Sequence, residues 1–211
     1  VIADFELTEA MLNSFIKKIK AKGTFTRPRI LICCPSNITK VERNAIREAA
    51  ESAGAKKVFV EEEPKVAAVG AGLDISAPSA SMVIDIGGGT TDIAILSLGG
   101  IVNSSSIRIA GNAFDNDIVK YIKDKYKLLV GDRTAEDIKI TIGTVFPGSR
   151  DEKMEVRGRD LVTGLPHTIT LTSDEVEEAL RESVYTIIHA VKGILEQTPP
   201  ELSADIIDKG I

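Results

Sequence analysis

The sequence has 211 residues, 43% of them hydrophobic and 27% charged, which is typical of globular proteins and excludes a disordered or low-complexity chain. The net charge of -5 argues against a nucleic-acid partner, which would require a basic face. No apolar run approaches the roughly 20 residues that a membrane-spanning helix needs. The adjacent Cys33 and Cys34 cannot form a disulfide framework, and two histidines leave little scope for histidine chemistry. We expect a mixed α/β protein of a reducing compartment.

The first 80 residues predict alternating helices and strands, which favours parallel strand pairing. Thr39 and Glu42 have the spacing of a capping box, and Gly54 stands where a glycine ends the helix that they begin. From apolar spacing and these signals we expect a helix at 11–19, a buried strand at 29–34, a helix at 39–54, a strand at 57–60, and a helix that opens at Pro64 and ends at Gly70 or Gly72.

The pattern changes after the polar loop 74–81. β-rich runs at 82–86, 91–98 and 101–109, joined by glycine turns, predict an antiparallel meander. Further on we expect a helix at 114–122, a second helix with Thr134 as its N-cap, strands near 154–156 and 167–171, and a long helix that Thr172 or Ser173 caps and Pro199-Pro200 ends.

The segment from Asp85 to Asp92, Asp-Ile-Gly-Gly-Gly-Thr-Thr-Asp, is the most informative part of the sequence. Its three glycines allow a sharp turn whose exposed amide groups can bind an anion, and Asp85 can face the water shell of a metal ion. It lacks the Lys-Ser/Thr pair of a P-loop. The residues after it favour a strand, whereas a dinucleotide fingerprint needs a helix there. On the glycines alone, a plain hairpin turn explains the segment equally well.

The acidic run Glu61-Glu62-Glu63 precedes Pro64 and offers a second candidate. Carboxylates at the start of a helix are favoured by the helix dipole, so a capping role explains them without any chemistry. Glu63, however, lies at the end of an expected parallel strand, where open α/β sheets place ligand chemistry. Both interpretations stay open at this point.

Several motifs occur together in order: Glu62-Glu63-Pro64, the small-residue segment 67–73, the segment 85–92, and Ala135-Glu136-Asp137-Ile138-Lys139. With them the sequence resembles the superfamily of actin, sugar-kinase and heat-shock-chaperone ATPases, and within it the MreB/Mbl family of bacterial cell-shape actins, over its whole length. The resemblance implies an α/β, actin-like ATPase (ribonuclease H-like) fold. It implies a partial first large subdomain (IA) at 1–80, a second large subdomain (IIA) at 81–128 and 173–211, and a small inserted subdomain (IIB) at 129–172.

The resemblance also implies site residues. Glu63, assisted by Thr90, would position or activate the attacking water, and Asp85 would approach magnesium without any direct protein–metal bond. Around the phosphates it places Gly87, Gly88, Gly89, Thr90 and Thr91, and around the ribose and adenine Glu136, Lys139 and Gly111. Without the resemblance, Glu136 and Lys139 are equally explained as an exposed salt bridge one helical turn apart. Ala110 and Asn112 depart from the family's usual Gly-Gly-Asp.

The family's first phosphate loop and its adenosine loop are expected before Val1 and after Ile211. We therefore expect these residues to be a piece of a larger protein, truncated at both ends, and to bind ATP weakly or not at all by themselves. The resemblance implies ATP and Mg²⁺ as cofactors of the full-length protein.

The function implied is a cytoplasmic, membrane-associated filament protein that self-assembles, lies on the inner membrane surface and organises the cell-wall synthesis machinery and rod shape. Phe25, among basic residues, falls at the family's membrane loop, where a packed surface phenylalanine is an equal alternative. Three other functions stay open: a chaperone-like ATPase, a sugar-kinase-like ATPase, and a non-catalytic interaction fragment.

Overall fold

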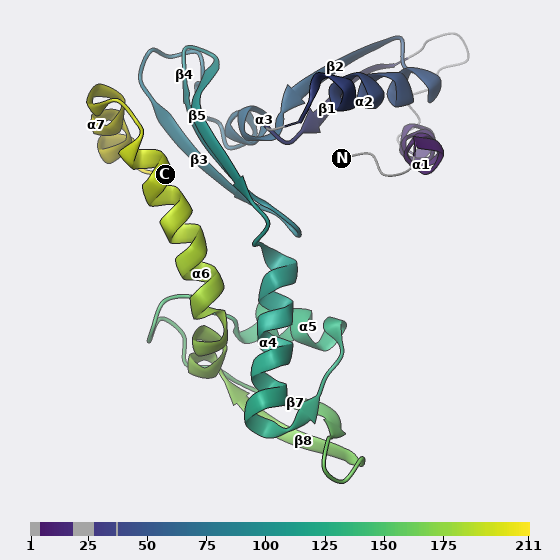
Figure 1. Ribbon diagram of the computed structural model, residues 1–211, viewed down its shortest axis with the longest axis vertical. Helices are drawn as coiled ribbons and strands as arrows, with labels where there is room; N and C mark the ends of the chain where they lie inside the picture. The colour runs from purple at the N-terminus through teal and green to yellow at the C-terminus, as the bar shows by residue number, and fades with distance from the viewer. Residues whose placement is uncertain (1–4, 19–27, 37) are drawn as a thin grey trace. The chain divides into compact units, whose positions relative to one another are not determined.

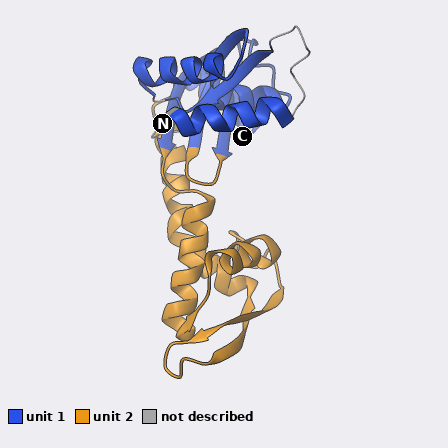
Figure 2. Cartoon of the chain, turned by 90° about the vertical axis from the view of Figure 1, so that its right-hand side faces the viewer, with its two compact units in different colours: residues 1–85, 92–106, 198–211 blue, residues 86–91, 107–197 orange. Residues whose placement is uncertain are grey.

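The computed structural model describes residues 5–18, 28–36 and 38–211 (Figure 1). The expected membrane loop at Phe25 and the end of the first helix, expected near Ile19, lie outside these residues. The chain divides into two compact units (Figure 2). Unit 1 comprises residues 1–85, 92–106 and 198–211, and unit 2 comprises residues 86–91 and 107–197.

The first part of unit 1 contains the alternating elements that the sequence predicts. They are α1 (Phe5–Lys18), β1 (Arg29–Cys34), α2 (Lys40–Ser52), β2 (Lys57–Glu62) and α3 (Glu63–Gly70). Strands β1 and β2 pair in parallel, as predicted, with Leu31 opposite Phe59. The expected burial of β1 is wrong, because exposed and partly buried residues alternate along it and Leu31 is 54% exposed. The capping box is confirmed: the Glu42 amide donates to Thr39 Oγ1 at 3.2 Å, and the Thr39 amide donates to Glu42 Oε2 at 2.7 Å.

The second part of unit 1 is built on a three-stranded sheet. Its elements are β3 (Ser81–Ile86), β4 (Thr91–Ser97), β5 (Gly100–Ile107) and α7 (Pro200–Lys209). The strand order β3-β4-β5 follows the chain, as the predicted meander requires, and the central β4 is buried along nearly its whole length. The Ala80 amide donates to Asp205 Oδ2 at 2.8 Å, which ties α7 to the start of β3.

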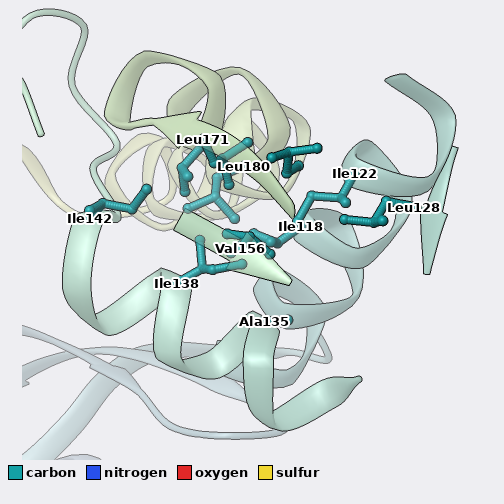
Figure 3. Close-up of a cluster of buried hydrophobic side chains, with 11 residues drawn as sticks. Ile118, Ile122, Leu128, Ala135, Ile138, Ile142, Val156, Leu171 and Leu180 are labelled. Atoms are coloured by element: carbon teal, nitrogen blue, oxygen red, sulfur yellow. The ribbon is translucent and has the colours of Figure 1, made fainter. Parts of the chain in front are cut away.

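Unit 2 is a layer of helices and a small antiparallel sheet around one core. Its elements are α4 (Gly111–Tyr126), β6 (Leu128–Leu129), α5 (Asp132–Ile142), β7 (Lys153–Asp160), β8 (Pro166–Thr172) and α6 (Ser173–Glu196). The sheet order is β6-β7-β8. Figure 3 shows how the helices and strands all contribute to the buried cluster, which includes Ile118, Ile122, Leu128, Ala135, Ile138, Ile142, Val156, Leu171 and Leu180.

Two features of unit 2 bear on the predictions for its helices. The capping residue Thr172 of α6 is confirmed, because its hydroxyl accepts the Glu175 amide hydrogen bond at 3.3 Å. The predicted N-cap Thr134 is wrong: α5 begins at Asp132 with Gly131 as N-cap. Glycine is tolerated at the N-cap, and Asp132 in the first turn is favoured by the helix dipole, so these two residues compete successfully with the threonine hydroxyl.

The predicted three-part division into subdomains IA, IIA and IIB stays a prediction, since the two compact units do not correspond to it one to one. Across the described residues, every helix is too short or too polar to cross a bilayer.

Candidate functional site

The glycine turn lies between β3 and β4, and a strand follows it, as the sequence predicts. The Gly87 amide donates to the Thr90 carbonyl at 2.9 Å, which closes the turn. The amide groups of Gly88, Gly89 and Thr90 have no backbone partner among the described residues, and all three glycines are exposed. Successive free amide groups at a tight turn form a concave site for an anion such as a phosphate.

The carbonyl groups of the same turn cap helix α4. The first amide groups of a helix have no partner inside the helix. Here the Gly111 amide donates to the Gly87 carbonyl at 3.0 Å, and the Asn112 amide donates to the Gly88 carbonyl at 2.8 Å. The approach is so close that a Cβ on Gly111 would stand 3.3 Å from the Gly87 carbonyl oxygen. The turn is therefore held by its carbonyl side, and its amide side stays available.

Lys139 on α5 reaches the same place. Its ammonium donates to the Gly111 carbonyl at 3.2 Å and lies 2.7 Å from Asp115 Oδ1. The structure thus brings together Gly87, Gly111 and Lys139, which the sequence singled out separately. Glu136 is exposed on α5, one turn before Lys139. The salt bridge between Glu136 and Lys139 that their spacing allows is not formed among the described residues, because Lys139 pairs with Asp115 instead.

The two threonines of the turn differ. Thr90 is half-buried, and its hydroxyl makes no hydrogen bond among the described residues. Thr91 is fully buried, and its hydroxyl donates to the Ile109 carbonyl at 2.6 Å. The Thr91 side chain therefore fixes the start of β4 against the segment that leads into α4.

Carboxylates gather at the strand ends of unit 1. Glu63 begins α3 directly after β2, Asp85 lies near the end of β3, and Asp92 lies near the start of β4. Burial raises the pKa of Glu63, and the nearby carboxylates of Asp92 and Asp85 raise it further. A carboxyl group with a raised pKa holds a proton more tightly and is a stronger base, which suits it to general acid–base chemistry.

Glu63 also differs from its two acidic neighbours. Glu62 lies 3.7 Å from Arg43 and 3.7 Å from Lys65, and Glu61 lies 4.0 Å from Lys65. Glu63 forms no ion pair with any residue that the structure describes. The helix-start charges at 61 and 62 are therefore explained by surface ion pairs, whereas Glu63 is not.

Asp92 is the residue that sequence reasoning missed. Its side chain is 3% exposed, and its Oδ1 has no hydrogen-bond partner among the described residues. Buried acids without a partner are rare because losing solvation costs free energy. A charged residue inside an otherwise apolar strand, Thr-Asp-Ile-Ala-Ile-Leu, was the signal that could have identified it.

A magnesium site made of protein ligands alone is not formed by the described residues, which contain no cluster of three or more metal-binding side chains. Mg²⁺ is commonly bound by one or two carboxylates together with phosphate oxygens and waters. Asp85, half-exposed at the strand end, has the chemistry to accept hydrogen bonds from the water shell of such an ion, which is the indirect contact expected for it.

Comparisons with known structures show the class to which this fold belongs. The chain is similar to the MreB5 protein of Spiroplasma citri, whose crystal structures are described as bound to ADP and to AMPPNP, with a TM-score of 0.93 and 43% identity; 100% of this chain and 63% of that one are covered. The MamK double helical filament matches with a TM-score of 0.76 at 21% identity over 97% of this chain and 60% of that one, a likeness of fold. The fold is therefore that of an actin-like protein.

The family follows from the sequence matches. The family model described as MreB/Mbl protein matches residues 1–211. The cell shape-determining protein Mbl of Bacillus cereus is 67% identical over 211 residues, and the cell shape-determining protein MreB of Escherichia coli is 51% identical over 213 residues. All of this chain is covered in both, with 63% and 61% of the relatives. This chain belongs to the MreB/Mbl family, and it spans less than two thirds of the length of these relatives.

Proposed function

We propose that this chain is part of an actin-like cytoskeletal protein that binds ATP, assembles with copies of itself into filaments and determines rod shape. The observation that carries the proposal is the glycine turn, whose carbonyl groups cap α4 while the amide groups of Gly88, Gly89 and Thr90 have no backbone partner within the described part of the chain. The family supports it, because relatives are named cell shape-determining proteins and a related structure is described as bound to a nucleotide. The family also favours this function over a chaperone-like or sugar-kinase-like ATPase.

The proposed roles follow the chemistry of each group. The amide groups of Gly88, Gly89 and Thr90 bind phosphate oxygens, and Gly87 shapes the turn. Glu63, assisted by the Thr90 hydroxyl, orients the attacking water. Catalysis of phosphoryl transfer to water depends mainly on such orientation and on electrostatic stabilisation. Thr91 contributes indirectly, through its buried hydrogen bond to the Ile109 carbonyl.

The nucleoside contacts and the metal complete the proposed site. Glu136, Lys139 and Gly111 contact the ribose and adenine. Asp85 would face the water shell of a magnesium ion, which would neutralise charge on the phosphates.

The partners proposed are further copies of the chain, the inner surface of the membrane and the cell-wall synthesis machinery, so the protein is expected in the cytoplasm at the membrane. For the membrane contact the proposal depends on Phe25. Liposome co-sedimentation of the full-length protein tests it: Phe25→Ser is expected to reduce binding, and undiminished binding would remove this residue from the proposal.

The hydrolytic role of Glu63 can be tested with Glu63→Gln in the full-length protein. Removal of a residue that orients or activates water is expected to lower the rate of ATP hydrolysis by about a hundredfold. ATP binding and ATP-dependent sedimentation of filaments are expected to persist, because Glu63 is not proposed to bind the phosphates.

Glu61→Gln is the matched control, since Glu61 lies two residues away and is exposed. It is expected to leave hydrolysis unchanged. Hydrolysis at the natural rate in Glu63→Gln would contradict the assignment of Glu63. A full-length protein that does not bind ATP would contradict the proposed function. For this chain alone we expect weak or no binding of ATP, because it spans less than two thirds of the length of its relatives. A micromolar affinity for Mg-ATP in calorimetry would overturn this expectation.

A further inference from the structure

The ion pair between Lys139 and Asp115 is an unusual feature of unit 2, because it is largely withdrawn from solvent. The two side chains are 23% and 17% exposed, and the ammonium and carboxylate oxygen are 2.7 Å apart. Asp115 Oδ1 itself is buried and has no other partner among the described residues. Removing one partner of such a pair leaves the other charge uncompensated, so each group fixes the position of the other.

The pair is anchored at the beginning of α4. Gly111 and Asp115 are four residues apart on this helix and therefore share a face. Lys139 reaches across from α5 and binds both, the carboxylate of Asp115 and the carbonyl of Gly111. The amide of the same Gly111 donates to the carbonyl of Gly87. Asp115 is thus connected to the glycine turn through Lys139 and Gly111, all within unit 2.

We propose that Asp115 is a positioning residue of the nucleotide site: it holds the Lys139 ammonium at the first turn of α4 and does not itself touch the nucleotide. The inference depends on the proposed function, in which Lys139 contacts the ribose and adenine. A free lysine has a long flexible stem and loses much rotamer freedom when it binds a ligand. A lysine that is already fixed loses less, so nucleotide affinity increases.

The carboxylate also changes what Lys139 can attract. Beside Asp115 the ammonium is part of a nearly neutral pair, whereas an unpaired ammonium would attract the most highly charged part of a nucleotide, its phosphates. Pairing therefore favours short directional hydrogen bonds to uncharged acceptors such as ribose hydroxyl groups and ring nitrogens. The phosphates are then left to the amide groups of the glycine turn.

A double-mutant cycle in the full-length protein tests this inference, with ADP affinity measured by calorimetry. Asp115→Asn and Lys139→Gln are each expected to weaken ADP binding by about tenfold, within the range of coupling between contacting residues. Because Asp115 acts through Lys139, the double variant is expected to bind ADP no more weakly than Lys139→Gln alone. Asp124→Asn is the control, since Asp124 is exposed near the other end of α4, and it is expected to bind ADP normally.

A second measurement needs no nucleotide. The ammonium of a fixed, shielded lysine exchanges its protons slowly enough to give a hydrogen–nitrogen NMR signal, which a mobile lysine does not give. We expect a Lys139 ammonium signal in this chain, its loss in Asp115→Asn, and its retention in Asp124→Asn. A purely structural role of Asp115 would not produce this pattern in a variant whose backbone spectrum is unchanged.

The inference is overturned if Asp115→Asn binds ADP as tightly as the natural protein, if the effects of the two single substitutions add in the double variant, or if the Lys139 signal persists in Asp115→Asn. Failure of the proposed function is a different outcome, namely a natural protein that binds no ADP while the NMR pattern is still observed.

Discussion

Replacing Asp92 by asparagine is expected to stabilise unit 1. Asp92 is 3% exposed, and its Oδ1 has no partner among the described residues. Its negative charge also disfavours ionisation of the nearby Glu63. Asparagine keeps the shape and removes the charge. Because a buried polar group without a partner costs about 1–3 kcal/mol, and more when it is charged, we expect the free energy of unfolding of unit 1 to rise by about 1–3 kcal/mol near neutral pH.

Two measurements follow this substitution. Hydrogen exchange of the β4 amide groups reports the opening free energy of unit 1 alone, and it should slow by about tenfold for each 1.4 kcal/mol gained. Carbon NMR titration follows the carboxyl group of Glu63. Burial keeps the pKa of Glu63 raised, but loss of the Asp92 charge removes one of the causes, so this pKa is expected to fall toward its ordinary value.

The control is Asp208→Asn, because Asp208 is exposed on α7 in the same unit. It is expected to change neither the exchange of the β4 amide groups nor the titration of Glu63. Unchanged or faster exchange in Asp92→Asn would refute the reasoning, since it would mean that the buried carboxylate is already compensated. If the stability gain is observed together with slower ATP hydrolysis in the full-length protein, the natural acid is retained for function at the expense of stability.

Other predictions concern unit 2 and can be checked by urea unfolding of the chain. Gly158→Ala is expected to cost about 1–3 kcal/mol or more, because its Cβ would stand 2.8 Å from Leu128 Cγ and against the Leu129 carbonyl oxygen; normal stability would contradict the close packing of β7 on β6. Leu171→Ala is expected to cost about 2–5 kcal/mol through the cavity that it leaves, whereas Ile140→Ala, at a position 68% exposed, should change stability by less than about 0.5 kcal/mol. Burial opposes ionisation of Glu175, but hydrogen bonds from Lys125, Tyr126 and Thr172 outweigh it and hold the pKa of Glu175 below its usual 4.5. A carboxyl group with a lowered folded-state pKa contributes stability above its unfolded pKa and loses this contribution as the pH falls through the folded value. The free energy of unfolding of Glu175→Gln should therefore fall less steeply than that of the natural chain as the pH drops below about 4.5. The same hydrogen bond raises the pKa of Tyr126 to about 12, and Glu175→Gln should lower it in an ultraviolet titration.

Local signals were sufficient to predict most elements. The capping box at Thr39 depends only on residues three positions apart, and α2 begins where it predicts. For α6 the sequence offered Thr172 or Ser173 as the cap, and the structure has Thr172. The parallel pairing of β1 and β2 followed from the order of strand, helix and strand. The N-cap of α5 was predicted three residues late, at Thr134 instead of Gly131. Several polar residues in a row can each begin a helix, so the cap signal alone does not choose among them.

The candidate site was predictable only where backbone chemistry defines it. The glycine turn is visible because few segments combine three successive glycines with flanking acids. The sequence carried a signal for Asp92, a charged residue in an apolar strand, but its lack of a partner was not visible. The pairing of Asp115 with Lys139 was not visible either, because burial and partners arise from contacts between residues far apart in the sequence. Lys139 shows the same limit: its spacing from Glu136 suggested a surface salt bridge, and the tertiary structure pairs it with Asp115, 24 positions earlier.

The carbonyl groups of the glycine turn are bonded to α4, whereas the amide groups of Gly88, Gly89 and Thr90 have no backbone partner among the described residues. Because the carbonyl groups of Gly87 and Gly88 already accept hydrogen bonds from the first amide groups of α4, that helix end is satisfied without a ligand. An anion bound by the amide groups of the turn would polarise the same peptide groups and strengthen their hydrogen bonds to α4. Lys139 reaches from α5 to Gly111 and Asp115 at the start of α4. We therefore expect phosphate binding at the turn and the position of Lys139 to be coupled through this continuous set of hydrogen bonds.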